Sequence, residues 1–597
     1  MDDAAQELVE AAMARGELFT AYDVAQTAIT DGSRSNRLVY LRSLAMARMG
    51  NPGGALASLD SVEPEQMSDE DSLSLRGRIL KDLALENGED RRGKFFDWAS
   101  EAYLVAHQKS GGAFSLINAA STAFLAGRRD SAAKMALDVL ALPAIQRPAE
   151  FYDAATSGEA YVLLGRFDDA ERAFEQALAF PDAHLGHRAS AARQLGLLSR
   201  GGDAARIEAI ARLVRPPPVL FFAGHMFHHD PAIEARIEKE IEEALNETEC
   251  RIAFGGAAAG SDILFAESIL RRGGELNLVL PFDRDDYVRQ SVRPWGENWI
   301  GRFNAVMSAA AQITYPANTQ YLGDPHQFAY GSEIAMGLAC LRADHLSTEA
   351  VQIAVSNETE TVAPAGSGSG IQLWRGTGRK AWTIAAEGID RSRSGPREGP
   401  RHTLERECRS IIMADYSGFS KLTEAARPLF LDEVMGRVAR ILDARKTSVL
   451  SCNTWGDALF AIVSEPVAAA DLALAVQEEL AQVDPTMMAL SADAGMRIAL
   501  HHGPLYRAID PVTNQMSYFG NEVTRAARIE PITPIGQVYA TQPLAALLAL
   551  HASRFFHTRY AGQLNLHKNY GMMPMHMIAR AAAYAQTAST RHPSSQA

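Results

Sequence analysis

The sequence predicts a multidomain protein with three folds in series: an all-α helical-repeat region over residues 1–213, an α/β doubly wound domain over 216–387, and an α+β domain over 407–583. The length of 597 residues indicates several domains, because a single hydrophobic core stops growing near about 250–300 residues. The pattern changes at Pro216–Pro218, where a helix cannot continue. A second change is the stretch 388–406, which is rich in Arg, Ser, Gly and Pro and predicts a linker.

Composition excludes several classes of protein. The net charge of −14 argues against nucleic-acid binding through bulk charge. No run of 18 apolar residues appears, so we expect no membrane span, and the acidic start does not resemble a signal peptide. The four cysteines are too far apart in sequence for a CxxC zinc site, and we expect free thiols in a reducing cytoplasm. They are Cys250, Cys340, Cys408 and Cys452.

Residues 1–213 carry a weak helical repeat. Gly50, Gly127 and Gly165 are each followed five residues later by Ala, and the last two glycines are 38 residues apart. This predicts a helix that ends at Gly, a short polar turn, and Ala at the close-packed start of the next helix. The unit resembles the tetratricopeptide repeat, whose usual period is 34. Such stacks present a concave surface to a protein partner, although a purely structural scaffold is the alternative.

The middle domain alternates strands with helices, which predicts a parallel, doubly wound sheet. The expected strands are 219–224, 251–254, 276–280, 312–315 and 350–356. Helices are expected between the first three strands.

A glycine-rich turn, 255–262, follows the second strand and opens a helix. Bare amides at a helix N-terminus suit an anion such as phosphate, although the glycines could serve only close packing. Together with 222–226, this turn resembles the Rossmann-like SLOG sensor class, which implies a nucleotide-derived ligand on the middle domain. The sensor-ligand residues are then Gly224, Gly255, Gly256, Gly260 and Ser261. The nearby His225, His228 and His229 are expected to be solvated loop residues rather than metal ligands.

Two further segments are expected to lack regular structure. Residues 365–370 alternate Gly with Ser and predict a flexible loop. The final residues, 584–597, predict a disordered tail.

The C-terminal domain places two aspartates at the ends of strands. Asp415 follows the expected strand 409–414, and Asp457 lies in the turn between strands 448–454 and 458–463. If those strands pair, the carboxylates meet at one edge and repel each other unless cations bridge them. Mg²⁺ takes one or two carboxylates and fills its other positions with water and phosphate oxygens.

Other residues of this domain suit a phosphorylated substrate. The amides that follow the first strand can cradle a triphosphate, and Arg528 supplies a charged planar fork for a developing phosphorane. The pattern predicts a phosphoryl-transfer site with two metal ions. The amide-bearing residues are Tyr416, Ser417, Gly418 and Phe419.

The order Asp-x-x-Gly-Phe at 415–419, Gly-Asp at 456–457 and Gly-Asn-x-Val-x-x-Ala-x-Arg at 520–528 resembles the catalytic domain of class III adenylate/guanylate cyclases. The resemblance implies a ferredoxin-like α+β fold and two ions of Mg²⁺ or Mn²⁺ bound by Asp415 and Asp457. It makes Arg528 the transition-state arginine and Lys568 the triphosphate lysine. Because family sites form between two catalytic domains, it also implies a homodimer.

Three positions depart from the family pattern. Asn453 stands where adenylate cyclases usually carry the base-reading Lys, and Ser517 stands at the partner position. Thr524 replaces the Asn that orients the ribose. Asn453 both donates and accepts hydrogen bonds, so it does not dictate adenine.

We therefore expect a cytoplasmic signalling enzyme that converts a nucleoside triphosphate, with ATP favoured, to a 3′,5′-cyclic nucleotide and pyrophosphate. Its repeats and its middle domain would regulate the reaction. The alternatives are a degenerate domain that binds nucleotide without turnover, an interaction scaffold, and a cyclase acting on GTP, CTP or UTP.

Overall fold

The computed structural model forms two compact units. The first contains the chain up to residue 216 together with 344–348, and the second contains 217–343 and 349–580. The residues described are 2–60, 70–86, 89–317, 320–324, 326–357, 367–389, 406–492, 494–566 and 571–581.

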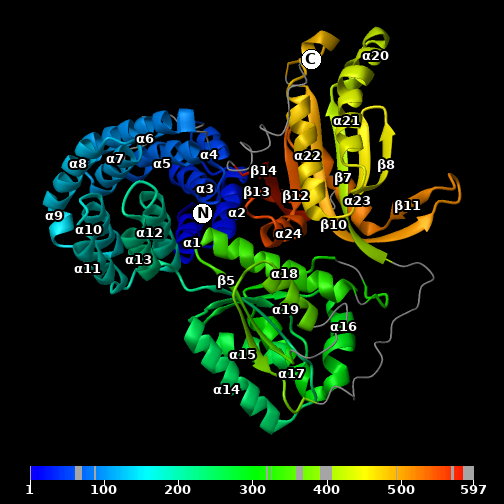
Figure 1. Cartoon of the computed structure of the whole chain (residues 1–597), viewed down its shortest axis with the longest axis horizontal. Helices are drawn as coiled ribbons and strands as arrows, with labels where there is room; N and C mark the ends of the chain where they lie inside the picture. Colours follow the sequence, from blue (N-terminus) through cyan, green and yellow to red (C-terminus); the bar gives the residue numbers. More distant parts are fainter. Residues whose placement is uncertain are drawn as a thin grey trace. The chain divides into compact units, whose positions relative to one another are not determined.

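The first unit is built from helices, and most helices pack against the next one along the chain (Figure 1). Its core is formed by alanine and larger apolar side chains from several helices. The helices are α1 (Asp2–Arg15), α2 (Leu18–Thr30), α3 (Asn36–Arg48), α4 (Pro52–Leu59), α5 (Glu70–Glu86), α6 (Glu89–Ser110), α7 (Ala113–Leu125), α8 (Arg129–Ala141), α9 (Pro143–Gln146), α10 (Phe151–Leu163), α11 (Phe167–Leu178), α12 (Leu185–Leu198) and α13 (Ala204–Val214).

The turns of the predicted repeat are confirmed. Gly127 lies just after the C-terminus of α7 and has a φ of +87°, a left-handed conformation that glycine adopts without a steric penalty. Gly165 does the same after α10 at φ +72°. The alanines five residues later, Ala132 and Ala170, are fully buried, so the small side chain lets the next helix pack closely.

The second unit contains two separate sheets, and the first is the parallel sheet predicted for the middle domain. Its strand order is β4-β3-β2-β1-β5-β6, so the direction of winding reverses between β1 and β5. The strands are β1 (Val219–Gly224), β2 (Ile252–Gly255), β3 (Glu275–Val279), β4 (Gln312–Thr314), β5 (Ala350–Ser356) and β6 (Ala381–Ala385).

Helices connect these strands and cover the sheet (Figure 1). They are α14 (Pro231–Thr248), α15 (Ser261–Arg271), α16 (Arg284–Tyr287), α17 (Glu297–Ala309), α18 (His326–His345) and α19 (Ser367–Gly376), with a π-helical and a 3₁₀ turn at Val288–Val292 and Arg293–Trp295. The loop predicted for 365–370 is wrong for its last four residues, because they open α19. The apolar side chains of 371–376, Trp374 above all, pack against the sheet and outweigh the glycines.

The second sheet has eight strands and is mostly antiparallel, as an α+β fold requires. Its order is β13-β14-β12-β10-β7-β9-β8, with β11 paired to β10. The strands are β7 (Arg406–Ser417), β8 (Val449–Trp455), β9 (Ala458–Val463), β10 (Gly495–Ile509), β11 (Met516–Phe519), β12 (Val538–Thr541), β13 (Phe556–Asn565) and β14 (Met572–Arg580).

Helices cover one face of this sheet and form the main core of the domain. They are α20 (Arg427–Phe430), α21 (Gly436–Ala444), α22 (Pro466–Leu480) and α24 (Gln542–His551). The remaining helix, α23 (Asn521–Ile529), packs on the opposite face, where Ala526 joins Ile411 and Ile462. A π-helical turn at Leu431–Met435 joins α20 to α21. In the described part of the chain, no helix is both long and apolar enough to cross a membrane. The predicted tail and most of the predicted linker lie outside the described residues.

Candidate functional site

The two predicted metal aspartates lie at the same end of neighbouring strands. β7 and β9 pair antiparallel, with Ala414 opposite Leu459, and Asp415 follows directly on β7. Asp457 occupies the turn that joins β8 to β9. The strands therefore pair, as the predicted meeting of the two carboxylates requires.

Two glycines bring the turns beside these aspartates together. Gly418 and Gly456 have φ values of +107° and +69°, which L side chains rarely adopt. A Cβ on Gly456 would lie 3.3 Å from the ring of Phe419, so that ring covers the hairpin turn. Phe419 also packs against Phe430, with ring centroids 4.9 Å apart, which fixes the turn after β7.

The two carboxylates interact electrostatically. Partial burial raises the pKa of Asp457, and the negative charge of Asp415 raises it further. A bound cation would relieve both effects, and the half-buried carboxyl oxygens are the donors that Mg²⁺ prefers. The residues present therefore fit the divalent ions that the resemblance implies.

Arg497 and Glu530 belong to this cluster, and the sequence analysis missed both. Arg497 lies opposite Asp415 on β10 and donates to its Oδ2 over 3.0 Å. Its Nε is 3.1 Å from Oε1 of Glu530. Burial raises the pKa of Glu530. The charge of Arg497 lowers it, and the charges of Asp415 and Asp457 raise it further. One signal was available, since Arg497 is a charged residue in the otherwise apolar run 496–500.

The residues predicted to cradle a triphosphate form a turn and a short 3₁₀ helix. Tyr416 is buried, packs on Phe430 and pairs with Met496 of β10, so it belongs to the strand and not to the turn. Ser417 ends β7, Gly418 makes the turn, and Phe419 begins the 3₁₀ segment Phe419–Lys421. The structure thus places the turn at Gly418, three residues after Asp415.

The predicted catalytic pair, Thr524 and Arg528, lies on α23. Thr524 is exposed on the helix, and Arg528 is half-buried in its last turn. Among the described residues, the Arg528 guanidinium has no ion-pair or hydrogen-bond partner. Its charge is therefore available to a ligand.

Buried polar contacts fix α23. The Oε2 of Glu522 accepts from His501 Nε2 over 2.6 Å and from Arg525 Nη1 over 2.9 Å. Burial lowers the pKa of His501, so the ring is neutral and its Nδ1 accepts from Thr541 over 2.8 Å. Arg525 also donates to the carbonyl of Pro316, in the middle domain, over 3.1 Å. Thr524 and Arg528 are thus carried by a firmly held helix.

The predicted base-reading residues come from two strands that contact each other. Asn453 is exposed on β8, and Ser517 is half-buried on β11, opposite Ala508. β8 and β11 approach each other, so both residues belong to one end of the domain. Lys568 lies outside the described residues.

The glycine-rich turn of the middle domain differs from its prediction. Four of its amides are not bare, because those of Ala257, Ala258, Ala259 and Ser261 donate to groups of this chain. Asp262 accepts from two amides, and burial raises the pKa of its carboxyl to about 7. The donor–acceptor pairs are Gly224 to Asp262 (3.0 Å), Ala257 to Tyr287 (3.1 Å), Ala258 to Asp262 (3.3 Å), Ala259 to Ser291 (2.9 Å) and Ser261 to His225 (3.2 Å).

The glycines of this turn permit close packing. A Cβ on Gly255 would lie 2.5 Å from the Phe222 ring, and one on Gly260 would lie 2.6 Å from the Phe227 ring. Gly256 faces the Asp262 carboxylate in the same way. The structural alternative therefore accounts for the glycines, and the ligand role of Gly224, Gly255, Gly256, Gly260 and Ser261 stays a prediction.

The three histidines after β1 do not share one environment. His225 is buried, so the prediction of a solvated residue is wrong there. Nδ1 of His228 is 3.0 Å from the carbonyl oxygen of Trp295. His229 is exposed and pairs with Glu234 at 2.5 Å.

Two family models match the chain. Residues 403–580 match the adenylate and guanylate cyclase catalytic domain, and residues 3–126 match the model described as Tetratricopeptide Repeats-Sensor. Neither covers the middle domain, so its resemblance to the SLOG class stays a prediction. No curated protein matches the chain.

Several solved structures are similar to the chain. The adenylyl cyclase CyaB from P. aeruginosa is 15% identical, with 30% of this chain and 96% of that chain covered and a TM-score of 0.27. The guanylate cyclase domain of RhGC from Catenaria anguillulae, in complex with GTP, is 17% identical, with 30% and 99% covered and a TM-score of 0.26. Adenylate cyclases from Trypanosoma brucei are 21% identical, with 29% and 88% covered and a TM-score of 0.24.

These TM-scores are too low to carry an argument, so the assignment depends on the family models. The C-terminal domain of this chain is a catalytic domain of the adenylate and guanylate cyclase family, and the N-terminal helices include tetratricopeptide repeats of the sensor type.

Proposed function

We propose that the chain is a nucleotide cyclase that converts a nucleoside triphosphate to a 3′,5′-cyclic nucleotide and pyrophosphate. The observation that carries the proposal is the proximity of Asp415 and Asp457, close to the turn at Gly418, in a domain whose α23 presents Arg528 without a partner among the described residues. In the reaction, the substrate's 3′-oxygen bonds to its own α-phosphorus. The bond to the β-phosphate bridging oxygen breaks, and the 3′-hydroxyl proton is released.

Each part of the site has a role that its chemistry allows. Asp415 and Asp457 would hold Mg²⁺ or Mn²⁺, which supply charge neutralisation at the phosphates. The turn at 416–419 offers amides to the triphosphate. Arg528 would stabilise charge that develops on the α-phosphate. Thr524 would position the ribose with a shorter reach than asparagine.

We also propose that the active form is a homodimer in which each chain supplies half of each site. Residues on a helix are separated by about 100° each, so Arg528 and Glu530 point in nearly opposite directions. Glu530 is directed towards Asp415 through Arg497, and Arg528 therefore points away from the aspartates of its own chain. This direction supports a second chain as the source of the arginine.

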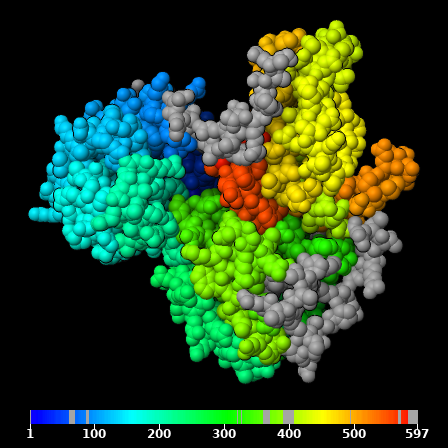
Figure 2. All heavy atoms as spheres, viewed as in Figure 1, coloured from blue at the N-terminus to red at the C-terminus, as the bar shows by residue number. Residues whose placement is uncertain are grey.

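An apolar surface near this site supports the dimer. Trp455 on β8 is 67% exposed, and Phe519 on β11 is 44% exposed. Figure 2 shows the β10–β11 hairpin, in orange, projecting from the body of the domain. Large exposed apolar side chains mark interaction surfaces, and this one lies beside the predicted base readers.

ATP is proposed as the preferred substrate on the family resemblance alone. Asn453 and Ser517 are proposed to contact the base, and Lys568 to bind the triphosphate. The repeats and the middle domain are proposed to regulate the cyclase, through a protein partner on the repeats and a nucleotide-derived ligand on the middle domain.

The direct test is to incubate the purified chain with ATP, GTP, CTP and UTP, separately and together, with Mg²⁺ or Mn²⁺. Cyclic products and pyrophosphate are measured by mass spectrometry. We expect a cyclic product, with cyclic AMP dominant in the mixture. Nucleotide binding without any cyclic product would favour the alternative of a degenerate domain. The observation behind that alternative is Thr524, which replaces the ribose-orienting Asn of the family.

The dimer is tested by mixing Asp457→Asn chains with Arg528→Ala chains. Each variant alone should be inactive. In the mixed dimer one site carries both lesions and the other carries neither, so it keeps half of the normal activity. Random pairing makes half of the dimers mixed, and we expect about a quarter of wild-type activity. If mixed dimers form and stay inactive, the sites lie within single chains.

A further inference from the structure

The cyclase domain and the middle domain meet along α18. The Tyr330 hydroxyl donates to the His502 carbonyl over 2.8 Å, and both residues are buried. Arg379 donates to the carbonyls of Ala549 and Leu550, at the end of α24, over 3.0 and 2.9 Å. These contacts define a seam inside one compact unit.

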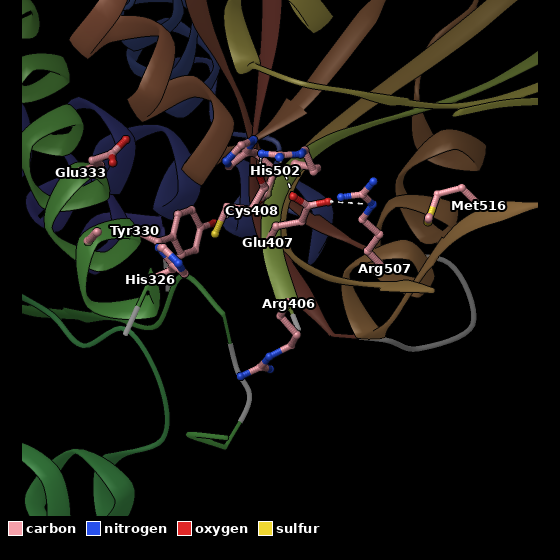
Figure 3. A pocket seen from close by; sticks show the side chains of 11 residues that line it. His326, Tyr330, Glu333, Arg406, Glu407, Cys408, His502, Arg507 and Met516 are labelled. Carbon is pink, nitrogen blue, oxygen red and sulfur yellow. Dashed lines mark hydrogen bonds and ion pairs between the residues drawn. The ribbon is translucent and has the colours of Figure 1, made fainter. Parts of the chain in front are cut away.

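A cavity of about 690 Å³ opens at this seam (Figure 3). It lies at the first residues of β7, about 20–30 Å along the extended strand from Asp415. It is therefore separate from the cyclase site, and it also lies apart from the glycine-rich turn of the middle domain. Its lining side chains are His326, Ala329, Tyr330, Glu333, Arg406, Glu407, Cys408, Arg409, His502, Arg507 and Met516.

Three arginines give the cavity its chemistry. Arg406 donates from Nε to Asp324 over 2.5 Å, and Arg409 donates from Nη2 to Glu407, also over 2.5 Å. Arg507 is half-exposed and approaches Glu407 only to 3.9 Å. Figure 3 shows a dashed line from the Glu407 carboxylate to Arg507. The same carboxylate pairs with Arg409, so it is shared by two guanidinium groups.

Some guanidinium donors are left over. Among the described residues, Nη2 of Arg406 and Nε of Arg409 are buried without a hydrogen-bond acceptor. Arg406 as a whole is only 8% exposed. Buried donors without acceptors are costly, and planar guanidinium groups match the oxygens of phosphate. The spare donors therefore indicate an anionic occupant with several oxygens.

The remaining wall limits what else can happen there. Burial raises the pKa of Cys408 to about 12, so the thiol stays protonated and is a poor nucleophile. Burial also lowers the pKa of His502 to about 3, so its ring is neutral. Ala329 and Met516 add apolar surface. The volume lies in the range typical of small-molecule sites and exceeds what one inorganic ion needs.

We propose that this cavity is a regulatory site for a small phosphorylated molecule. An occupant bound by Arg409 and Arg507 would bridge β7 and β10 and face α18 of the middle domain. Met516, in its wall, directly precedes Ser517 on β11, and Arg507 lies opposite Tyr518. A ligand that binds two conformations of this seam with different affinity shifts their populations, and with them the position of β11. The regulatory half of the inference rests on the proposed cyclase function.

Binding is tested on the full chain with a chelator present, which keeps divalent ions from the aspartates. The probes are inorganic phosphate, ribose 5-phosphate and adenosine 5′-monophosphate, measured by calorimetry. We expect saturable binding, tighter for a phosphorylated ribose than for inorganic phosphate. Arg507→Gln and Arg409→Gln should each weaken it at least tenfold, and Asp457→Asn should leave it unchanged.

Arg440→Gln is the matched control, because the Arg440 side chain is 64% exposed against 53% for Arg507 and has a similarly loose ion pair, 3.7 Å from Glu479 against 3.9 Å. It should bind like the wild type. The inference is wrong if no probe binds, or if Arg507→Gln and Arg440→Gln bind alike. These measurements need no turnover, so they stand apart from the cyclase assay.

The regulatory half is tested by measuring cyclase rates with and without ribose 5-phosphate. We expect at least a twofold change in the wild type and in Arg440→Gln, and none in Arg507→Gln, whose basal rate should be normal. Binding without any change in rate overturns regulation and leaves a simple binding site. A chain without cyclase activity would overturn the proposed function, while the binding result would keep its meaning.

Discussion

The hairpin turn at Asp457 and the glycine-rich turn at Asp262 look alike in sequence, since each places glycine and aspartate in a turn that follows a strand. In the structure they differ. Asp457 is partly open, and burial together with Asp415 raises its pKa. Asp262 is 9% exposed and accepts hydrogen bonds from the amides of Gly224 and Ala258.

The difference shows what makes a glycine–aspartate turn a candidate site. At Asp457, like charges face each other and the carboxylate is only partly buried. At Asp262, the carboxylate occupies the amides that an outside anion would need, and the glycines serve packing. An open carboxylate pair indicates ligand chemistry, whereas a closed carboxylate–amide turn indicates structure.

The largest effect is expected for Asp457→Asn. The variant loses one charge from the metal site and should lose at least about 100-fold in turnover. Its thermal midpoint should be unchanged or slightly higher, because repulsion from Asp415 is removed. Cyclic product is measured at limiting Mg²⁺, and near-normal turnover would contradict the metal assignment.

Asp262→Ala should lower stability and leave turnover nearly unchanged. It leaves two buried amides without an acceptor, so at pH 5.5 we expect a loss of about 2 kcal/mol or more in local stability. Hydrogen exchange of peptides covering 219–262, followed by mass spectrometry, measures that loss. Turnover of the folded protein should stay within twofold of wild type. A variant with normal exchange but no activity would instead make Asp262 a functional residue.

A smaller effect on turnover is expected for Arg497→Gln, which removes the cation between Asp415 and Glu530. Three carboxylates then face one another, and we expect about a tenfold loss at limiting Mg²⁺, with partial recovery at high Mg²⁺. Arg497→Lys should recover part of the activity, because it keeps the charge. Equal losses for Gln and Lys would mean that the geometry of the guanidinium, not its charge, is required.

The mildest test is the pH dependence of the middle domain. The folded-state pKa of Asp262, about 7, lies above its unfolded value, so the folded state binds the proton more tightly. Its contribution to stability is full below about pH 4 and is lost as the pH rises towards 7, by at most about 1.4 kcal/mol per pH unit. Hydrogen exchange at pH-corrected rates should show this slope in the wild type and not in Asp262→Asn. A rising slope would contradict the assignment.

The sequence by itself determined the fold classes and the order of the motifs. Apolar periodicity located the helices of the first unit, and the strand–helix alternation predicted the parallel sheet of the middle domain, because burial patterns are local properties of the chain. Asp415, Asp457 and Arg528 were found because their motifs are short and lie in a fixed order.

Only the tertiary structure decided which groups are paired. Arg497 and Glu530 join the aspartates through pairing of β10 with β7 and through the end of α23, contacts that span many residues. The same holds for Asp262, whose partner Gly224 is 38 residues away. The cavity along α18 likewise depends on how two domains pack. Sequence patterns report local burial, whereas the availability of a charge depends on neighbours that distant parts of the chain supply.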